Sequence, residues 1–201
     1  MSSTIKIYKS LSKYDFSTLQ LIEKECFPSV VEDSNSNLNL EYLVLIDPEN
    51  LFYSVKIPES NNYDSSLTRG EFKADLWKQD LIELFIASDQ GTSYQEINLA
   101  PSGAYWTVQF SYYRTRISET EGPLAGIEIE VRTTLVGKIL SLKIPLSCII
   151  EGCSISEHSR LNCCAIIGNN PRNYFATASL NPVKPDYHDI TSWGKVELVK
   201  L

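Results

Sequence analysis

The chain has 201 residues, of which 43% are hydrophobic and 21% are charged, and it carries a net charge of −7. This composition is typical of a folded globular protein with enough chain to bury a core. The 18 Lys and Arg residues are scattered without a basic run, whereas a duplex-binding protein needs a basic face to displace counterions from phosphate. We therefore expect no nucleic-acid partner. The acidic net charge is compatible with sugars and small molecules as ligands.

The sequence contains no apolar stretch of the length that predicts a membrane-spanning helix. Met1–Lys13 alternates polar and apolar residues and lacks the apolar block of a signal peptide. The five cysteines are odd in number and show no dense disulfide spacing. We therefore expect reduced thiols, no membrane partner and a cytoplasmic location.

The first predicted element is a short helix over Tyr14 to Glu25. Phe16, Leu19 and Ile22 recur at helical spacing, and Pro28 ends the run.

Beyond this helix, the hydrophobic pattern has a period of two. Asp47–Asn50 predicts a turn between two strands, and Pro145 indicates a strand end or an edge position. The predicted strands are Tyr42–Ile46, Leu51–Ile57, Ile127–Val131, Leu140–Leu146, Leu161–Ile167, Tyr174–Ala178 and Val196–Val199. Many short strands at this spacing predict an all-β, antiparallel sandwich or jelly roll with one short N-terminal helix, in a single domain over residues 1–201.

Two turn signals, Gln90-Gly91 and Pro101-Ser102-Gly103, divide the segment Trp77–Arg116 into three strands. Symmetric pairing about each turn predicts that Glu83 lies beside Asn98, and Asn98 beside Thr107. It also predicts that Glu96 lies between Phe85 and Gln109.

This register separates the sheet into two faces, because a slip of one residue turns every side chain over. The apolar face is predicted to hold Ile82, Leu84, Ile86, Ile97, Leu99, Trp106, Val108 and Phe110. The other face is predicted to hold Trp77, Gln79, Glu83, Glu96, Asn98, Thr107 and Gln109, with Leu81 and Phe85 covered by another segment. Carboxylates and amides bind hydroxyl groups, and an aromatic ring packs on the apolar face of a sugar, so the polar face is a candidate sugar site.

Several segments of the chain resemble family 9 carbohydrate-binding modules, in the DOMON-like superfamily. Leu76–Ile86 resembles the signature strand of this family, and Tyr94–Gly103 resembles the strand that follows. Further similar segments are Phe110–Arg114, Asn162, Arg172–Phe175, Pro185–His188 and Trp193-Gly194. The resemblance covers roughly residues 40–201.

In that family, a terminal sugar lies between two aromatic rings, and a carboxylate binds its hydroxyl groups. The resemblance places these roles on Trp77, on Glu83 six residues later, and on Tyr187. Where the family has a basic side chain on the next strand, this chain has Glu96 and Asn98. The calcium sites of the family match no residues that we can assign.

Each candidate also has a purely structural interpretation. Trp77 could seal the end of a strand, and Tyr187 and His188 could close the sandwich. Glu83 could form an ion pair with Arg114 or Arg172, and either arginine is also a candidate ligand contact.

Catalysis and metal binding have weaker signals. A glycosidase needs two carboxylates that flank the scissile bond, and Glu83 with Glu96 is the one pair that shares a face. Nucleophile and phosphate-loop motifs are missing. The spacing of His158 from Cys148 and Cys153 matches no zinc motif, and two histidines and one methionine leave few haem ligands.

The sequence therefore predicts a non-catalytic module that binds a carbohydrate or another small polar ligand, with no cofactor. The alternative hypothesis is an intracellular DOMON-like domain that uses the same face for a protein partner or a metabolite.

Overall fold

The computed structural model describes residues 4–25, 29–32, 39–87, 92–150, 155–181 and 184–201. None of the helices in these ranges combines the length and the apolar character that a bilayer crossing requires. The strands are β1 (Thr4–Lys9), β2 (Ser29–Glu32), β3 (Asn39–Ile46), β4 (Asn50–Pro58), β5 (Leu81–Ala87), β6 (Tyr94–Leu99), β7 (Tyr105–Tyr112), β8 (Thr115–Ile117), β9 (Glu128–Thr134), β10 (Gly137–Pro145), β11 (Arg160–Ile167), β12 (Asn173–Ala176) and β13 (Gly194–Lys200). The helices are α1 (Phe16–Glu25) and the 3₁₀ turns η1 (Leu76–Lys78), η2 (Ser118–Thr120), η3 (Leu146–Cys148) and η4 (Ile190–Ser192).

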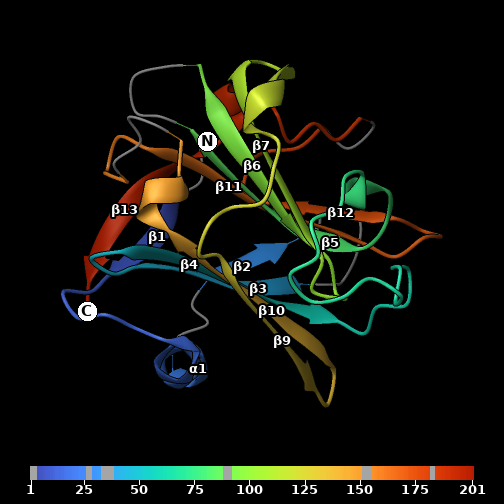
Figure 1. Cartoon of the computed structure of the whole chain (residues 1–201), viewed down its shortest axis with the longest axis horizontal. Helices are drawn as coiled ribbons and strands as arrows, with labels where there is room; N and C mark the ends of the chain where they lie inside the picture. The colour runs from blue at the N-terminus through green and yellow to red at the C-terminus, as the bar shows by residue number, and fades with distance from the viewer. Residues whose placement is uncertain (1–3, 26–28, 33–38, 88–91, 151–154, 182–183) are drawn as a thin grey trace.

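The strands form one curled, 13-stranded sheet, in the order β8-β7-β6-β5-β11-β13-β1-β3-β4-β10-β9, with β12 beside β11 and β2 beside β3. Figure 1 shows that the curl brings the two halves of this sheet over each other as two layers. The first layer holds β5 to β8 with β11 and β12, and the second holds β3, β4, β9 and β10. The mostly β fold and the sandwich arrangement agree with the sequence prediction.

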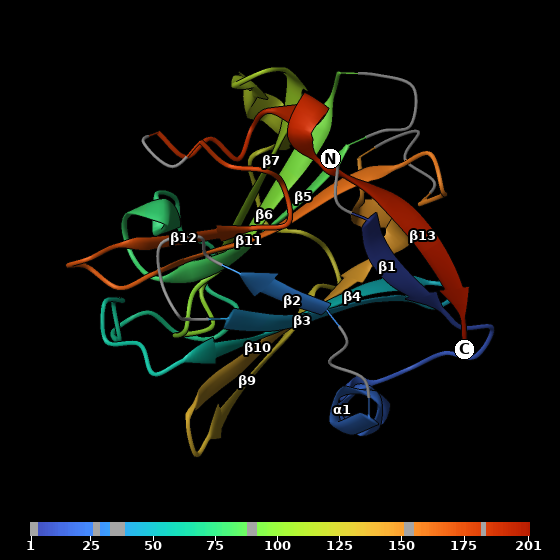
Figure 2. The same ribbon diagram turned by 180° about the vertical axis from the view of Figure 1, so that it is seen from behind.

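The main core fills the space between the two layers. Leu84 and Ile97 from the first layer are fully buried in the same cluster as Tyr53 and Leu142 from the second. A second buried cluster covers the outer face of the first layer, and a third lies under α1 on the outer face of the second. Figure 2, the view from behind, shows that α1 lies on the side of the second layer, away from β5 and β6.

Most predicted elements are confirmed, with boundaries that differ by at most three residues. Helix α1 begins at Phe16 rather than Tyr14, because Asp15 accepts a hydrogen bond from the Thr18 N–H and caps the helix. Pro145 is the last residue of β10, as its missing N–H requires. The Gln90-Gly91 turn lies outside the described residues.

We expected a purely antiparallel sheet, and this prediction is wrong at the centre of the sheet. Strand β1 pairs in parallel with both β13 and β3. The sequence signal for β1 is only a short alternation near the N-terminus, and pairing direction depends on segments that are far apart in the chain.

The predicted register between β6 and β7 is also wrong, by one residue. Asn98 pairs with Trp106 rather than Thr107, and Glu96 pairs with Val108 rather than Gln109. The turn closes between Ala100 and Ala104, so it contains an odd number of residues and its centre lies at Ser102.

This shift turns β7 over. Trp106, Val108 and Phe110 lie on the same face as Glu83 and Glu96, where they join the second cluster. Thr107 instead points to the opposite face and donates to the Glu96 carbonyl. The predicted burial of Trp106 and Trp193 is nevertheless confirmed, since both side chains are almost fully buried.

Candidate functional site

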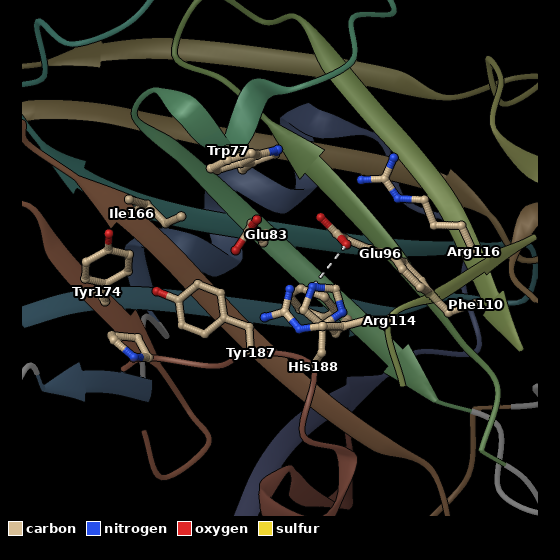
Figure 3. A pocket seen from close by; sticks show the side chains of 12 residues that line it. Trp77, Glu83, Glu96, Phe110, Arg114, Arg116, Ile166, Tyr174, Tyr187 and His188 are labelled. Atoms are coloured by element: carbon tan, nitrogen blue, oxygen red, sulfur yellow. Dashed lines mark ion pairs between the residues drawn. The ribbon is translucent and has the colours of Figure 1, made fainter. Parts of the chain in front are cut away.

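A cavity of about 420 Å³ lies on the outer face of the first layer, over β5, β6 and β7. It is lined by Trp77, Glu83, Phe85, Glu96, Phe110, Arg114, Arg116, Ile166, Tyr174, Pro185, Tyr187 and His188. Six of the eight predicted site residues are among them, and Asn98 and Arg172 are not. Figure 3 shows Trp77 on one side, Tyr187 and His188 on the other, and the two carboxyl groups between them.

The two carboxyl groups come from neighbouring strands. Glu83 pairs across the β5–β6 ladder with Asn98, and Phe85 pairs with Glu96, so the predicted register of this hairpin is confirmed. The carboxyls are diagonal neighbours on one face, and Asn98 Nδ2 donates to Glu96 Oε1 at 2.9 Å. Asn98 is fully buried and positions Glu96, while its own Oδ1 has no hydrogen-bond partner among the described residues, so its role as a ligand contact stays a prediction.

Burial governs the ionisation of this pair. Burial raises the pKa of Glu83 well above its ordinary value, and the Glu96 carboxyl raises it further. Burial raises the pKa of Glu96 to about 7, although Asn98 and two arginines act in the other direction. Burial therefore favours the protonated form of both carboxyl groups, and Glu96, with a pKa of about 7, is partly ionised near neutral pH.

Glu83 carries an unsatisfied atom. The side chain is 3% exposed, and its Oε2 has no hydrogen-bond partner among the described residues. Buried polar groups are nearly always hydrogen-bonded, because an unpaired one costs about 1–3 kcal/mol. An orphaned oxygen that faces a cavity is typical of a group that binds a ligand.

Trp77 forms one wall, although it is not on the strand where we placed it. It lies on the 3₁₀ turn η1 just before β5, and 48% of the side chain is exposed. Arg172 fastens this turn, since its guanidinium donates to the carbonyl oxygens of Trp77, Lys78 and Gln79. Arg172 therefore positions the turn that carries Trp77, and its expected role as a ligand contact stays a prediction.

Tyr187 forms the opposite wall and is firmly held. Its hydroxyl donates to the Ala165 carbonyl at 2.9 Å. Its own carbonyl accepts hydrogen bonds from the Asn162 amide and from Trp193 Nε1. The ring is 7% exposed, so its remaining accessible surface faces the cavity.

His188 is a neutral donor or acceptor in this site. Burial and the nearby Arg114 lower the pKa of the imidazole to about 4. Its Nδ1 lies 2.7 Å from the Tyr94 hydroxyl, which also accepts the Arg114 N–H. An imidazole that accepts the Tyr94 proton at Nδ1 carries its own proton on Nε2, which lies 3.9 Å from Glu96 Oε2.

Two arginines line the cavity near this point, Arg114 from the β7–β8 turn and Arg116 from β8. Arg114 donates to Asp186 at 2.9 Å and adopts a left-handed backbone conformation, with φ of 53°. A left-handed non-glycine residue is uncommon and frequently marks a functional position. Arg116 lies over the Trp106 ring at 4.9 Å.

The sequence analysis missed Arg116, Phe110 and Tyr174. Phe110 was assigned to the wrong face by the register error in β7. Arg116 follows Arg114 at the spacing that keeps two side chains on one side of a strand, and this signal could have indicated it. Tyr174 reaches the cavity because β12 pairs with β11, and this pairing is not visible in the sequence.

Metal ligands do not gather at this cavity. Among the described residues, no group of three or more His, Cys, Asp and Glu side chains is placed to hold a metal ion. The calcium sites of the resembling family therefore stay unassigned.

No protein-family model and no curated protein matches this sequence. Solved structures do match. A candidate carbohydrate-binding protein from Bacteroides uniformis ATCC 8492 aligns with a TM-score of 0.71 and 10% identity, over 99% of this chain and all of that one. A family 9 carbohydrate-binding module from Caldicellulosiruptor kristjanssonii, in complex with cellotriose, aligns with a TM-score of 0.62 and 12% identity, over 98% and 95% of the two chains. This chain has the family 9 fold.

The family 9 fold extends along the whole chain. A structure of a Caldicellulosiruptor kristjanssonii family 9 module in complex with glucose also aligns, with a TM-score of 0.52 over 98% of this chain. The predicted resemblance to this family is thus confirmed for the fold, and its wider DOMON-like grouping stays a prediction. At 10–12% identity, the shared architecture does not by itself assign the ligand.

Proposed function

We propose that this protein is a non-catalytic carbohydrate-binding module that holds one sugar ring between Trp77 and Tyr187. The carboxyl groups of Glu83 and Glu96 and the imidazole of His188 bind the hydroxyl groups of the sugar. Structures with the same fold are described in complex with cellotriose and with glucose, which supports this class of ligand.

The observation that carries the proposal is the orphaned oxygen of Glu83 between two aromatic walls. A large, half-exposed indole beside a cavity offers an apolar platform for the C–H face of a sugar. A buried carboxyl without a protein partner offers hydrogen bonds that only a ligand can complete. Together they match the amphipathic surface of a sugar ring.

Hydrolysis is disfavoured by the placement of the acid pair. A glycosidase sets its two carboxyl groups on opposite sides of the scissile bond. Glu83 and Glu96 are diagonal neighbours on adjacent strands of one sheet face, and the solved structures with this fold are described as carbohydrate-binding proteins. We therefore propose binding without turnover.

Calorimetric titration with a panel of mono- and oligosaccharides tests the proposal. We expect dissociation constants in the micromolar-to-millimolar range, because the site offers a few hydrogen bonds worth about 0.5–1.5 kcal/mol each. Trp77→Ala should weaken binding about tenfold or more, which corresponds to about 1.4 kcal/mol or above.

The control is Leu135→Ala, which removes a fully exposed apolar side chain at the β9–β10 turn. It should leave both the circular dichroism spectrum and the affinity unchanged. Absence of binding to every sugar class, or equal affinity of the Trp77 variant, would overturn the proposal. A protein retained from a pull-down through this face, and lost in the same variant, would favour the alternative of a protein partner.

A further inference from the structure

Among the described residues, no Lys or Arg forms an ion pair with either carboxyl group at the centre of the cavity, and the basic group beside Glu96 is the imidazole of His188. Glu83 Oε2 is buried without a hydrogen bond among the described residues. Glu96 accepts one hydrogen bond, from the neutral Asn98 amide, and its other oxygen lies 3.9 Å from His188. The side chains are 3% and 5% exposed, so water offers little compensation.

The cations near this pair make their hydrogen bonds to other groups, and the buried Nε of Arg172 has no partner among the described residues. Arg114 donates to Asp186. Arg172 donates to three backbone carbonyl oxygens of the turn that carries Trp77, and Arg116 lies over Trp106. His188 is bonded to the Tyr94 hydroxyl.

The ionisation of the pair agrees with this geometry. The arginines lower the pKa values of both carboxyl groups, but burial outweighs them, and both pKa values remain raised. The protein alone therefore does not stabilise two carboxylates at this place. A cationic group on a ligand would supply the missing charge.

We propose, building on the proposed sugar-binding function, that Glu83 and Glu96 form a subsite for an ammonium group and that the preferred ligand is an amino sugar with a free amine. An ammonium has three donors and no acceptor. One donor can reach Glu83 Oε2 and another Glu96 Oε2, and charge-assisted hydrogen bonds are about twice as strong as neutral ones.

The same charges orient the ligand. Arg114 and Arg116 line the cavity and repel an ammonium, whereas the two carboxyls stand between the aromatic walls (Figure 3). The amine-bearing carbon is therefore expected to point toward β5 and β6. Binding would ionise both carboxyl groups and release their protons to the solvent.

The test compares matched pairs of sugars by calorimetric titration near neutral pH. Glucosamine, galactosamine and mannosamine are each measured against the parent hexose and the N-acetylated form. For at least one pair, we expect the free amine to bind about tenfold more tightly than the parent, and acetylation to abolish the gain. Titration in two buffers of different ionisation enthalpy should show net proton release for the amine alone.

Substitutions of the two glutamates test whether they cause the preference for the amino sugar. In Glu83→Gln and Glu96→Gln, the ratio of amine to parent affinity should fall toward one. If these variants fail to fold, the wild-type ratios and the proton release still decide the matter.

The outcomes separate the two proposals. If parent hexoses bind and no amine binds more tightly than its parent, the amino-sugar inference is wrong and the sugar-binding function stands. If no sugar of any kind binds, both are wrong.

Discussion

At the residue scale, Tyr187 shows how one side chain can serve both the fold and the site. Its hydroxyl donates a hydrogen bond to the Ala165 carbonyl inside the protein. Only the ring is left for the cavity. This division separates a stacking role from a hydrogen-bonding role.

Tyr187→Phe should therefore lower the free energy of unfolding by about 0.5–1.5 kcal/mol and leave sugar affinity nearly unchanged. Urea denaturation and calorimetric titration measure the two effects. Tyr112→Phe is the matched control, because Tyr112 is 60% exposed. A loss of affinity as large as that of Tyr187→Ala would show that the hydroxyl contacts the ligand.

A second prediction at this scale concerns Glu96 and the pH dependence of the free energy of unfolding. Its pKa is about 7 in the folded chain against an ordinary value of 4.5. The native state therefore holds a proton that the unfolded state has lost, and the free energy of unfolding falls as pH rises between these values. His188 acts oppositely, because its lowered pKa makes the unfolded state bind the extra proton between about pH 4 and 6.5.

Below about pH 6.5, the titrations of Glu96 and His188 change the free energy of unfolding in opposite directions. We therefore expect the free energy of unfolding to decline above this pH. Glu96→Gln should make the decline between about pH 6.5 and 7.5 shallower, and the remaining decline comes from Glu83, whose pKa burial also raises. Urea denaturation across this range is the measurement. Parallel profiles for wild type and variant would show that Glu96 titrates normally.

At the element scale, η1 is the least regular part of the site and the most dependent on a distant residue. The turn presents Trp77, and Arg172 holds three of its backbone carbonyls from the loop before β12. The wall of the cavity is thus assembled from two segments about 95 residues apart.

Arg172→Met should weaken sugar binding severalfold, up to about tenfold, although Arg172 does not line the cavity. The loss should appear in calorimetric titration, with a folded spectrum retained. Arg69→Met, at an exposed arginine, is the matched control. Unchanged affinity in Arg172→Met would mean that packing alone positions η1.

Helix α1 is fastened to the other layer by a buried acid. Glu23 is 5% exposed, accepts the Ser54 hydroxyl at 2.6 Å and pairs with Arg132. Removing one member of a buried network leaves the others unpaired, and the partly exposed Arg132 reduces this penalty.

Glu23→Ala should lower the free energy of unfolding by about 2–4 kcal/mol and leave sugar affinity unchanged, since α1 lies across the sandwich from the cavity. Chemical denaturation checks the first effect and titration the second. Glu157→Ala, at an exposed glutamate, controls for charge removal. An equal effect of both variants would contradict the anchoring role.

At the scale of the whole molecule, the central core draws on strands from both ends of the chain. Ile5 and Ile7 of β1 and Val196 of β13 belong to the same buried cluster as Leu84 and Leu142. The single domain over residues 1–201 stays a prediction, and this shared core is the reason to keep it.

A chain with one shared core should unfold in one transition. Leu84→Ala should lower the stability by about 2–5 kcal/mol and shift the circular dichroism and tryptophan fluorescence curves together. Two separate transitions would show that the layers are independent units.

The sequence by itself determined the class of fold and most of the site chemistry. Alternation of period two identified β9 and β10, because successive side chains of a strand point to opposite faces of the sheet. The Glu83–Asn98 pairing also followed, since the opposite register would have buried charges in the main core.

Only the tertiary structure decided which side chains share the cavity. The odd length of the Ala100–Ala104 turn set the face of Phe110. The pairing of β12 with β11 and of β8 with β7 brought Tyr174 and Arg116 to the cavity of the acid pair. Likewise, only the tertiary structure showed that Arg172 supports η1. Local patterns encode which face a residue prefers, but long-range pairing selects its neighbours, and a binding site is defined by its neighbours.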